Sequence, residues 1–222
     1  MPTADASYGG NPLPIQTLAA AVIVVDFAAM PAYAEPLRIV ALGDSLTAGY
    51  GLEAGDAFTG RLEAALKERG HEVVIVNAGV SGDTASDGLA RVDWSVGDDA
   101  DAVIVELGAN DALRGVDPAI TRDALDKLLA RLAERGLPVL VAGMRAPPNL
   151  GAEFGAAFNP IYPELAAKYG AILYPFFLDG VAARTDLNQP DGIHPNAEGV
   201  VIVVERMAPS VEALISRVGA AN

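Results

Sequence analysis

A short apolar segment that ends in one glycine and two polar residues is the feature that most constrains the fold. Leu37–Leu42 is apolar apart from Arg38, and Gly43, Asp44 and Ser45 follow it directly. A strand this apolar is typical of a parallel sheet whose two faces are both covered by helices. Such sheets bind ligands beyond the carboxyl ends of their strands, which is where Ser45 would lie. The structural alternative is that Ser45 only caps the helix that follows.

Strand and helix patterns alternate along the rest of the chain. Further strands are expected over residues 73–76, 101–107, 138–144 and 171–174. Helices are expected over 56–69 with Asp56 as the cap, over a short stretch through 89–94, over 117–136, and over 153–169 with a break near Asn159. This order predicts an α/β fold, a three-layer sandwich in which helices cover both faces of a sheet of about five parallel strands.

The segment after Asn196 is ambiguous. Val200–Val204 has strand propensity, yet the residues from Glu205 to Val218 have a helical pattern. We expect one helix here, kinked or restarted at Pro209, because tertiary contacts override local propensity.

The first 34 residues differ from the rest in composition. An apolar run, Leu18–Met30, precedes Ala32-Tyr33-Ala34, which has the small-residue spacing of a signal-peptidase site. Two features disagree, because residues 1–34 contain no Lys or Arg and Asp26 interrupts the run. We expect residues 1–34 to be a secretion leader and residues 35–222 to be the domain. The protein would then be periplasmic or secreted, or cytoplasmic if the leader is not processed. The alternative is an N-terminal strand or arm that packs on the domain or on a neighbouring molecule.

Composition excludes several classes of protein. The chain has 29 acidic and 15 basic residues, a net charge of −14, and this argues against nucleic acid as a partner. Since it has no cysteine, it cannot form a disulfide or use a thiolate nucleophile. The apolar run is too short to span a bilayer, so no stable membrane insertion is expected. A monomer or a small homo-oligomer is expected.

One histidine lies in a context suited to catalysis. His194 follows Asp191 by three residues in a turn rich in Gly and Pro, whereas His71 lies among charged residues and is expected at the surface. A serine nucleophile needs a base, and the base needs an acid that orients it. Asp191 and His194 could supply both to Ser45. The alternative for His194 is a structural residue in the turn.

Oxyanion donors are also available in the loops at this sheet edge. Candidates are the backbone N–H groups of Ser45 and Gly82 and the side-chain amide of Asn110. Gly82 alone could merely shape a turn, and Asn110 alone could merely cap a loop. Their joint occurrence at one edge of the sheet favours a hydrolytic site.

Four sequence blocks share the order and spacing of a known family. They are Gly43-Asp44-Ser45-Leu46, Ser81-Gly82-Asp83-Thr84, Gly108-Ala109-Asn110-Asp111 and Asp191-Gly192-Ile193-His194-Pro195. In these blocks the chain resembles the SGNH, or GDSL, hydrolases, and most of all their bacterial arylesterases, lysophospholipases and acyl thioesterases. The resemblance extends over residues 37–218 and implies a flavodoxin-like strand order.

The resemblance also implies roles for these residues. Ser45 would be the nucleophile, Asp191 and His194 would complete a catalytic triad, and Ser45, Gly82 and Asn110 would form the oxyanion hole. The implied activity is that of a serine esterase that hydrolyses short- to medium-chain aryl or acyl esters through an acyl-enzyme. Thioesters and lysophospholipids are further substrates that it suggests.

No metal or cofactor is expected, and the partner is a small acyl ester. In the related thioesterases two loops line the acyl groove, here residues 112–116 and 146–150, and this suggests substrate contacts from Leu113, Ala146, Pro147 and Leu150. Asp44, beside the serine, is a further candidate for substrate contact. The alternative for these loops is plain packing. Three other functions stay open: a carbohydrate O-deacetylase, a flavodoxin-like module whose Gly43–Gly49 loop cradles a phosphate, and an esterase-derived protein that only binds.

Overall fold

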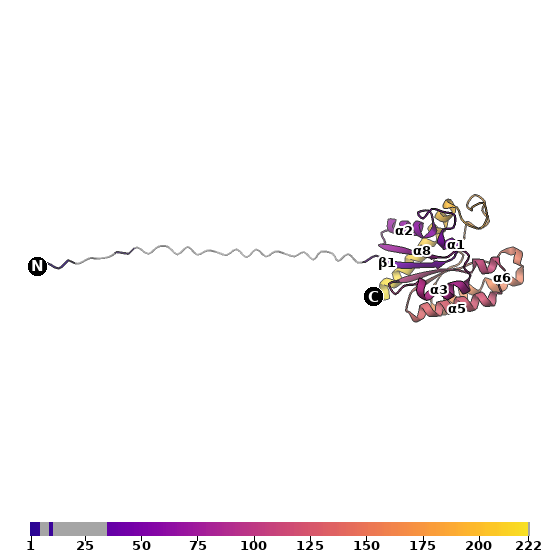
Figure 1. Cartoon of the computed structure of the whole chain (residues 1–222), viewed down its shortest axis with the longest axis horizontal. Coiled ribbons are helices and arrows are strands. Elements are labelled where there is room, and N and C mark those ends of the chain that lie inside the picture. Colours follow the sequence, from indigo (N-terminus) through magenta and orange to yellow (C-terminus); the bar gives the residue numbers. More distant parts are fainter. Residues whose placement is uncertain (5–8, 11–34, 222) are drawn as a thin grey trace. The chain divides into compact units, whose positions relative to one another are not determined.

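The computed structural model describes residues 1–4, 9–10 and 35–221 (Figure 1). Most of the predicted leader therefore lies outside the described residues, and both interpretations of it stay predictions. The residues from Glu35 onward form a compact unit. In the described part of the chain, no helix has the length and apolarity that crossing a membrane requires.

The sheet has five parallel strands in the order β2-β1-β3-β4-β5. The strands are β1 (Leu37–Gly43), β2 (Val73–Gly79), β3 (Ala102–Glu106), β4 (Val139–Ala142) and β5 (Ile172–Tyr174). This order confirms the predicted α/β class and its flavodoxin-like topology. Gly43 pairs with Gly79 of β2 and with Glu106 of β3, so the loops that follow these three strands leave from one edge.

Helices cover both faces of this sheet (Figure 1). They are α1 (Ser45–Ala48), α2 (Phe58–Glu68), α3 (Ala85–Ser95), α4 (Ala109–Leu113), α5 (Pro118–Glu134), α6 (Ala152–Phe158), α7 (Ile161–Tyr169) and α8 (Ala197–Ala221), with a 3₁₀ turn, η1, at Pro148–Leu150. Helices α2 and α8 pack together on one face, and α3 and α5 pack together on the other. The break expected near Asn159 separates α6 from α7.

The C-terminal segment is helical, as expected. Helix α8 continues through Pro209, which is exposed, while Val200, Val203 and Val204 are buried against the sheet layer. Burial of these apolar side chains outweighs their preference for strands. Residues of all five strands contribute to the same core.

The starts of two helices differ from expectation. Helix α2 begins at Phe58 without a side-chain cap, and Asp56 pairs with Arg61 instead of capping it. At α1 the capping residue is Asp44, whose carboxylate accepts the Leu46 N–H at 3.0 Å. Ser45 is therefore the first residue of α1 rather than its cap, and its hydroxyl is left for other contacts.

Candidate active site

Close backbone packing places Ser45 at the carboxyl edge of the sheet. Only Asp44 separates the end of β1 from the start of α1, and α1 lies against the end of β2. A Cβ atom on Gly79 would come within 2.3 Å of the Ala48 nitrogen, so only glycine allows this approach. A Cβ on Gly43 would likewise lie 2.1 Å from the Thr47 hydroxyl. The two glycines thus let the first turn of α1 sit directly on the strand ends.

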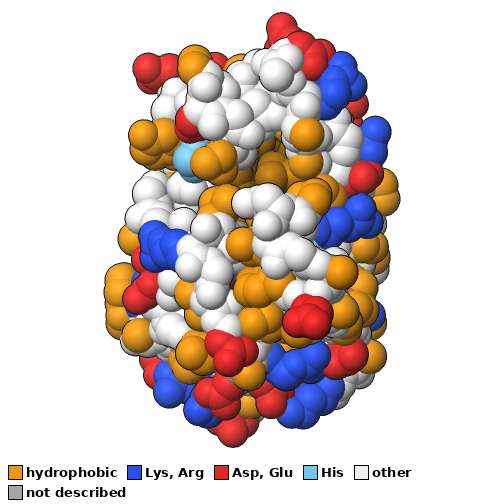
Figure 2. Space-filling model, turned by 90° about the vertical axis from the view of Figure 1, so that its right-hand side faces the viewer, with side chains coloured by type: hydrophobic (Ala, Val, Ile, Leu, Met, Phe, Trp, Pro, Cys, Tyr) orange, Lys and Arg blue, Asp and Glu red, His pale blue; other side chains and the backbone are white. Residues whose placement is uncertain are grey.

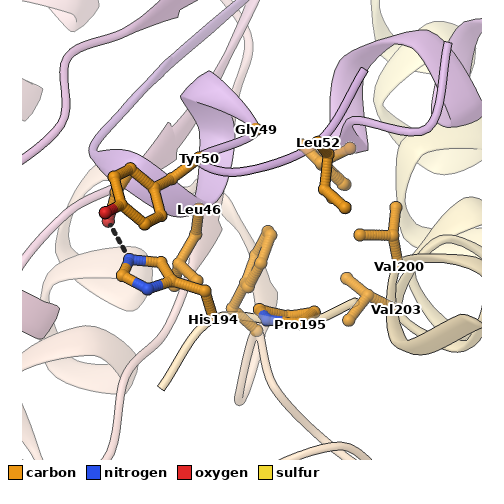
Figure 3. Close-up of a pocket in the computed structure, with 11 residues that line it drawn as sticks. Leu46, Gly49, Tyr50, Leu52, His194, Pro195, Val200 and Val203 are labelled. Atoms are coloured by element: carbon orange, nitrogen blue, oxygen red, sulfur yellow. Dashed lines mark hydrogen bonds between the residues drawn. The ribbon is translucent and has the colours of Figure 1, made fainter. Parts of the chain in front are cut away.

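Ser45, His194 and Asp191 form a chain of two hydrogen bonds. His194 Nε2 lies 2.9 Å from Ser45 Oγ (Figure 3), and His194 Nδ1 lies 2.7 Å from Asp191 Oδ2. The other carboxylate oxygen of Asp191 accepts the backbone N–H groups of Ile193 and His194 at 2.9 and 3.0 Å. These bonds, the one from the His194 N–H above all, lower the pKa of Asp191 to about 2. An ionised Asp191 favours a proton on Nδ1, which leaves Nε2 to accept the serine proton.

Two residues that sequence analysis did not single out hold this loop in place. The Gln189 side-chain amide donates to the carbonyls of Tyr50 and Pro195 at 2.7 and 3.0 Å. The Tyr50 ring packs 4.6 Å from the His194 ring, centroid to centroid (Figure 3). The segment after the serine and the segment that carries the histidine are thereby joined. Neither residue belongs to a sequence block, so only the folded chain reveals this contact.

The expected oxyanion donors lie in the loops beside Ser45. As the first residue of α1, Ser45 has an N–H group with no partner inside its helix. Gly82 has a φ of +90°, and among the described residues no backbone acceptor binds its N–H group. The Asn110 amide donates to Asp44 Oδ2 at 3.1 Å and to the Asp83 carbonyl at 3.0 Å. Contact of the Asn110 amide with an oxyanion would require it to share or exchange one of these bonds.

Two arginine side chains hold the loop that contains Gly82. Arg114 Nη2 donates to the Gly82 carbonyl at 2.8 Å. Arg91 is nearly buried, pairs with Asp83 at 2.6 Å, and donates to the Gly43 carbonyl at 2.8 Å. Arg91 also donates to the Ala78 carbonyl of β2 at 2.8 Å, so these charge-assisted bonds tie the ends of β1 and β2 to the loop that carries Gly82.

The residues expected to contact substrate lie in different surroundings. Asp44 is fully buried behind Ser45, so it has no surface that a substrate could meet. Leu113 is 49% exposed, and Leu150 is half-buried in η1. Ala146 and Pro147 line an open hollow together with residues of α6. None of the five lines the pocket that contains Ser45 and His194.

That pocket is narrow and apolar. Besides Ser45 and His194, its lining is made of residues from the α1–α2 segment, α8 and the intervening loops: Leu46, Gly49, Tyr50, Leu52, Phe58, Phe177, Pro195, Val200 and Val203 (Figure 3). The space-filling view shows a histidine side chain among hydrophobic side chains that border a hollow (Figure 2). The residues of this lining are far apart in the sequence and meet only in the folded chain, so sequence analysis missed the pocket.

The second histidine lies elsewhere. His71 is partly buried and its Nε2 lies 3.3 Å from Glu212 of α8, so it is less exposed than expected. Within the part of the chain that the structure describes, no group of three or more His, Asp or Glu side chains is arranged to hold a metal ion.

Comparison with known proteins assigns the family. The model of the GDSL-like lipase/acylhydrolase family matches residues 41–201, most of the chain. The chain belongs to the GDSL-like lipase/acylhydrolase family. Its sequence is 37% identical to an arylesterase of Vibrio mimicus over 172 residues, which cover 77% of this chain and 86% of that protein. It is 35% identical to esterase TesA of Pseudomonas aeruginosa, with 80% and 89% covered.

Solved structures agree with this assignment. AlinE4, an SGNH-hydrolase family esterase, superposes with a TM-score of 0.69 at 48% identity and covers 81% of this chain and 97% of its own. The crystal structure of TesA superposes with a TM-score of 0.76 at 34% identity, with 80% and 99% covered. The predicted family, its fold and its activity as a carboxylic ester hydrolase are thus confirmed.

Proposed function

We propose that this GDSL-family hydrolase uses Ser45 as its nucleophile, His194 as general base and acid, and Asp191 as the carboxylate that orients His194. In the first step Nε2 of His194 takes the hydroxyl proton while Ser45 Oγ attacks the ester carbonyl. The imidazolium then protonates the leaving alcohol, and an acyl-enzyme remains. In the second step His194 takes a proton from a water molecule, which attacks the acyl-enzyme and releases the acid. His194 then returns that proton to Ser45 Oγ.

The backbone N–H groups of Ser45 and Gly82 and the Asn110 amide are the proposed donors to the oxyanion. Fixed donors stabilise the tetrahedral intermediate because they need no reorganisation as charge develops. Ser45 adds the partial positive charge of its place at the start of a helix, although α1 is too short for a large effect. Removal of one such donor costs on the order of 10²–10³ in turnover.

One observation carries this proposal: the hydrogen bonds of 2.9 and 2.7 Å that join Ser45 to His194 and His194 to Asp191. A turn that merely contained a histidine would not need a serine hydroxyl from 149 positions away as its partner. A phosphate-binding module would give Asp191 and His194 no task. The ionised Asp191 further favours a base over a structural residue.

The substrate we propose is a short- to medium-chain carboxylic ester. The narrow pocket beside Ser45 has an almost wholly apolar lining, which suits a small acyl or aryl group better than a carbohydrate. A relative from Escherichia coli is named thioesterase 1/protease 1/lysophospholipase L1, at 35% identity. Thioesters and lysophospholipids are therefore proposed as secondary substrates. Activity in the periplasm or outside the cell, after removal of residues 1–34, is part of the same proposal.

The test is a Ser45→Ala variant assayed on nitrophenyl esters from acetate to palmitate and on acyl-CoAs. We expect loss of nearly all turnover with unchanged thermal unfolding, because the hydroxyl attacks substrate and is not part of the core. Ser216→Ala, a serine on the exposed side of α8, is the matched control and should keep full activity. Substantial turnover by a folded Ser45→Ala variant would refute the nucleophile assignment. Preference for palmitate over acetate would refute the proposed acyl length.

A further inference from the structure

Two carboxyl groups lie buried directly behind Ser45. Asp44 follows β1, and Glu106 is the last residue of β3, paired in register with Gly43. Both side chains are 0% exposed. The nearby guanidinium of Arg91 forms its salt bridge with Asp83 instead. Two carboxyl groups in one buried site cannot both be ionised without a cation, so the pair has to retain a proton.

The hydrogen bonds indicate which of the two groups holds this proton. Asp44 accepts at both oxygens, from the Leu46 N–H at 3.0 Å and from the Asn110 amide at 3.1 Å. Glu106 accepts at Oε2 only, from the Thr47 hydroxyl at 2.7 Å and the Asp44 N–H at 3.2 Å. Its Oε1 is buried and accepts no hydrogen bond from any described residue. An ionised Glu106 would therefore hold buried negative charge on an oxygen without a donor, whereas a neutral Glu106 has a proton of its own to donate.

We infer that Glu106 works as a neutral carboxylic acid that donates its proton to the Asp44 carboxylate and so positions Asn110 and the first turn of α1. Asp44 is the link, since it accepts from Asn110 on one oxygen and caps the serine helix with the other. Glu106 touches no substrate and acts through Asp44 and Thr47, so it is a positioning residue. This inference rests on the proposed role of Asn110 at the oxyanion.

The electrostatics agree with this assignment. Burial, and then the charge of Asp44, raise the pKa of Glu106 well above its usual range. Burial raises the pKa of Asp44 to about 6, against the opposing effects of hydrogen bonds from Leu46, Glu106 and Asn110. Near neutral pH the proton thus stays on Glu106 while Asp44 is ionised.

Other titratable groups surround the pair. Asp111 of α4 accepts from the Thr121 hydroxyl and the Ala85 N–H, so it is engaged away from Glu106. Tyr162 of α7 donates to the Leu107 carbonyl, and burial raises its pKa well above the usual value, so it stays neutral. His194, when charged, favours the ionised form of Asp44. None of these groups supplies a proton that would replace the one on Glu106.

An infrared spectrum tests the protonation state without any assay of activity. At about pH 8 ordinary Asp and Glu side chains are ionised, so a carbonyl stretch of a protonated carboxylic acid would stand apart from the carboxylate bands. We expect such a band in the unmodified protein and in the control Glu63→Gln, whose carboxylate binds Lys67 and the Ile75 N–H at the surface. The band should vanish in Glu106→Gln. Its absence from the unmodified protein, or its persistence in Glu106→Gln, would overturn the inference.

Kinetics test the positioning role. A glutamine has the shape of the neutral acid, with an amide N–H that can donate to Asp44 and a carbonyl oxygen that accepts, so Glu106→Gln should retain kcat/KM within about threefold near neutral pH. Glu106→Leu removes the donor to Asp44, and we expect a loss of about ten- to a hundredfold, mostly in kcat, because Asn110 is no longer held. At alkaline pH the unmodified enzyme should lose activity as Glu106 ionises, and Glu106→Gln should lack this loss.

Each outcome decides for or against the inference. If folded Glu106→Gln is as impaired as Glu106→Leu, or if Glu106→Leu keeps full turnover, the positioning role is wrong. If Glu106→Leu does not fold, the infrared band and the alkaline limb of Glu106→Gln still decide. Failure of the proposed function would appear separately, as activity in Ser45→Ala with the infrared band unchanged.

Discussion

Asp191 holds His194 through its carboxylate and two backbone N–H groups, and it does so at the molecular surface. In Asp191→Asn an amide replaces the oxygen that accepts the Nδ1 proton, which favours the other tautomer of His194. We expect kcat to fall by roughly 10²–10⁴, less than for Ser45→Ala or His194→Ala, because Asp191 does not touch substrate. Steady-state kinetics on nitrophenyl acetate measure this loss.

The control for this prediction is Asp186→Asn, an exposed aspartate nearby in the chain whose partner is Arg184. It should leave turnover unchanged. A double Asp191→Asn, His194→Ala variant should lose little more than His194→Ala alone, since the pair acts as a unit. If the two losses add, Asp191 only shapes the turn and the acid of the triad is elsewhere.

The sequence predicts the reacting residues better than the residues that support them. Ser45 and His194 stand out because each lies in a polar turn after an apolar strand or beside glycines. Glu106 does not, since it reads as the polar end of a buried strand, and only the register with Gly43 places it behind Ser45. Gln189 contacts the Tyr50 carbonyl from 139 positions away, and no local pattern encodes that bond.

At the scale of elements, the close packing of α1 against the end of β2 determines where Ser45 lies. The three atoms nearest to an added Cβ on Gly79 are all backbone, namely the Ala48 nitrogen at 2.3 Å, its Cα at 2.8 Å and the carbonyl of the capping residue Asp44 at 2.8 Å. Backbone cannot rotate aside as a side chain can, so α1 must shift in Gly79→Ala. We expect the free energy of unfolding to fall by about 1–3 kcal/mol, and kcat to fall as well.

Urea unfolding and kinetics on the same preparation check this prediction. Gly219→Ala is the matched control, because a Cβ there meets no atom within 4 Å and the residue lies in a helix. That variant should be as stable as the unmodified protein or slightly more stable. Equal behaviour of the two variants would show that α1 does not depend on the close approach at Gly79.

Element types could be predicted from the sequence more reliably than element ends. Helix α8 shows why, since Val200–Val204 favours a strand locally, yet within the helix Val200, Val203 and Val204 pack on one face against the core. The expected cap at Asp56 was wrong because a salt bridge to Arg61 engages that carboxylate. The pocket lining could not be predicted, because α8 and the α1–α2 segment meet there only after folding.

At the scale of the whole molecule, two kinds of acidic group have opposite effects on the free energy of unfolding as pH changes. Hydrogen bonds lower the pKa values of four carboxyl groups, chiefly from Lys67 for Glu63, the Thr84 hydroxyl for Asp87, Lys168 for Asp126 and the His194 backbone N–H for Asp191. Such groups stabilise the fold above their unfolded pKa of about 4, and this stability is lost as pH falls through their folded values. The folded pKa of Asp191 is about 2, so its own contribution is lost between about pH 4 and pH 2.

Asp44 and Glu106 act in the opposite direction. Burial raises the pKa of Asp44 to about 6 and that of Glu106 further, so their contribution is fully present below about pH 4 and is lost as pH rises through these folded values. The net charge of −14 at pH 7 adds self-repulsion, which also lowers stability as pH rises.

We therefore expect the free energy of unfolding to be greatest near pH 5 and to decline toward pH 9, measured by urea unfolding at constant ionic strength. Glu106→Gln should show a shallower decline, while Glu63→Gln should keep the original slope above pH 5. Stability that rises between pH 5 and pH 8 would mean that the buried pair does not retain its proton.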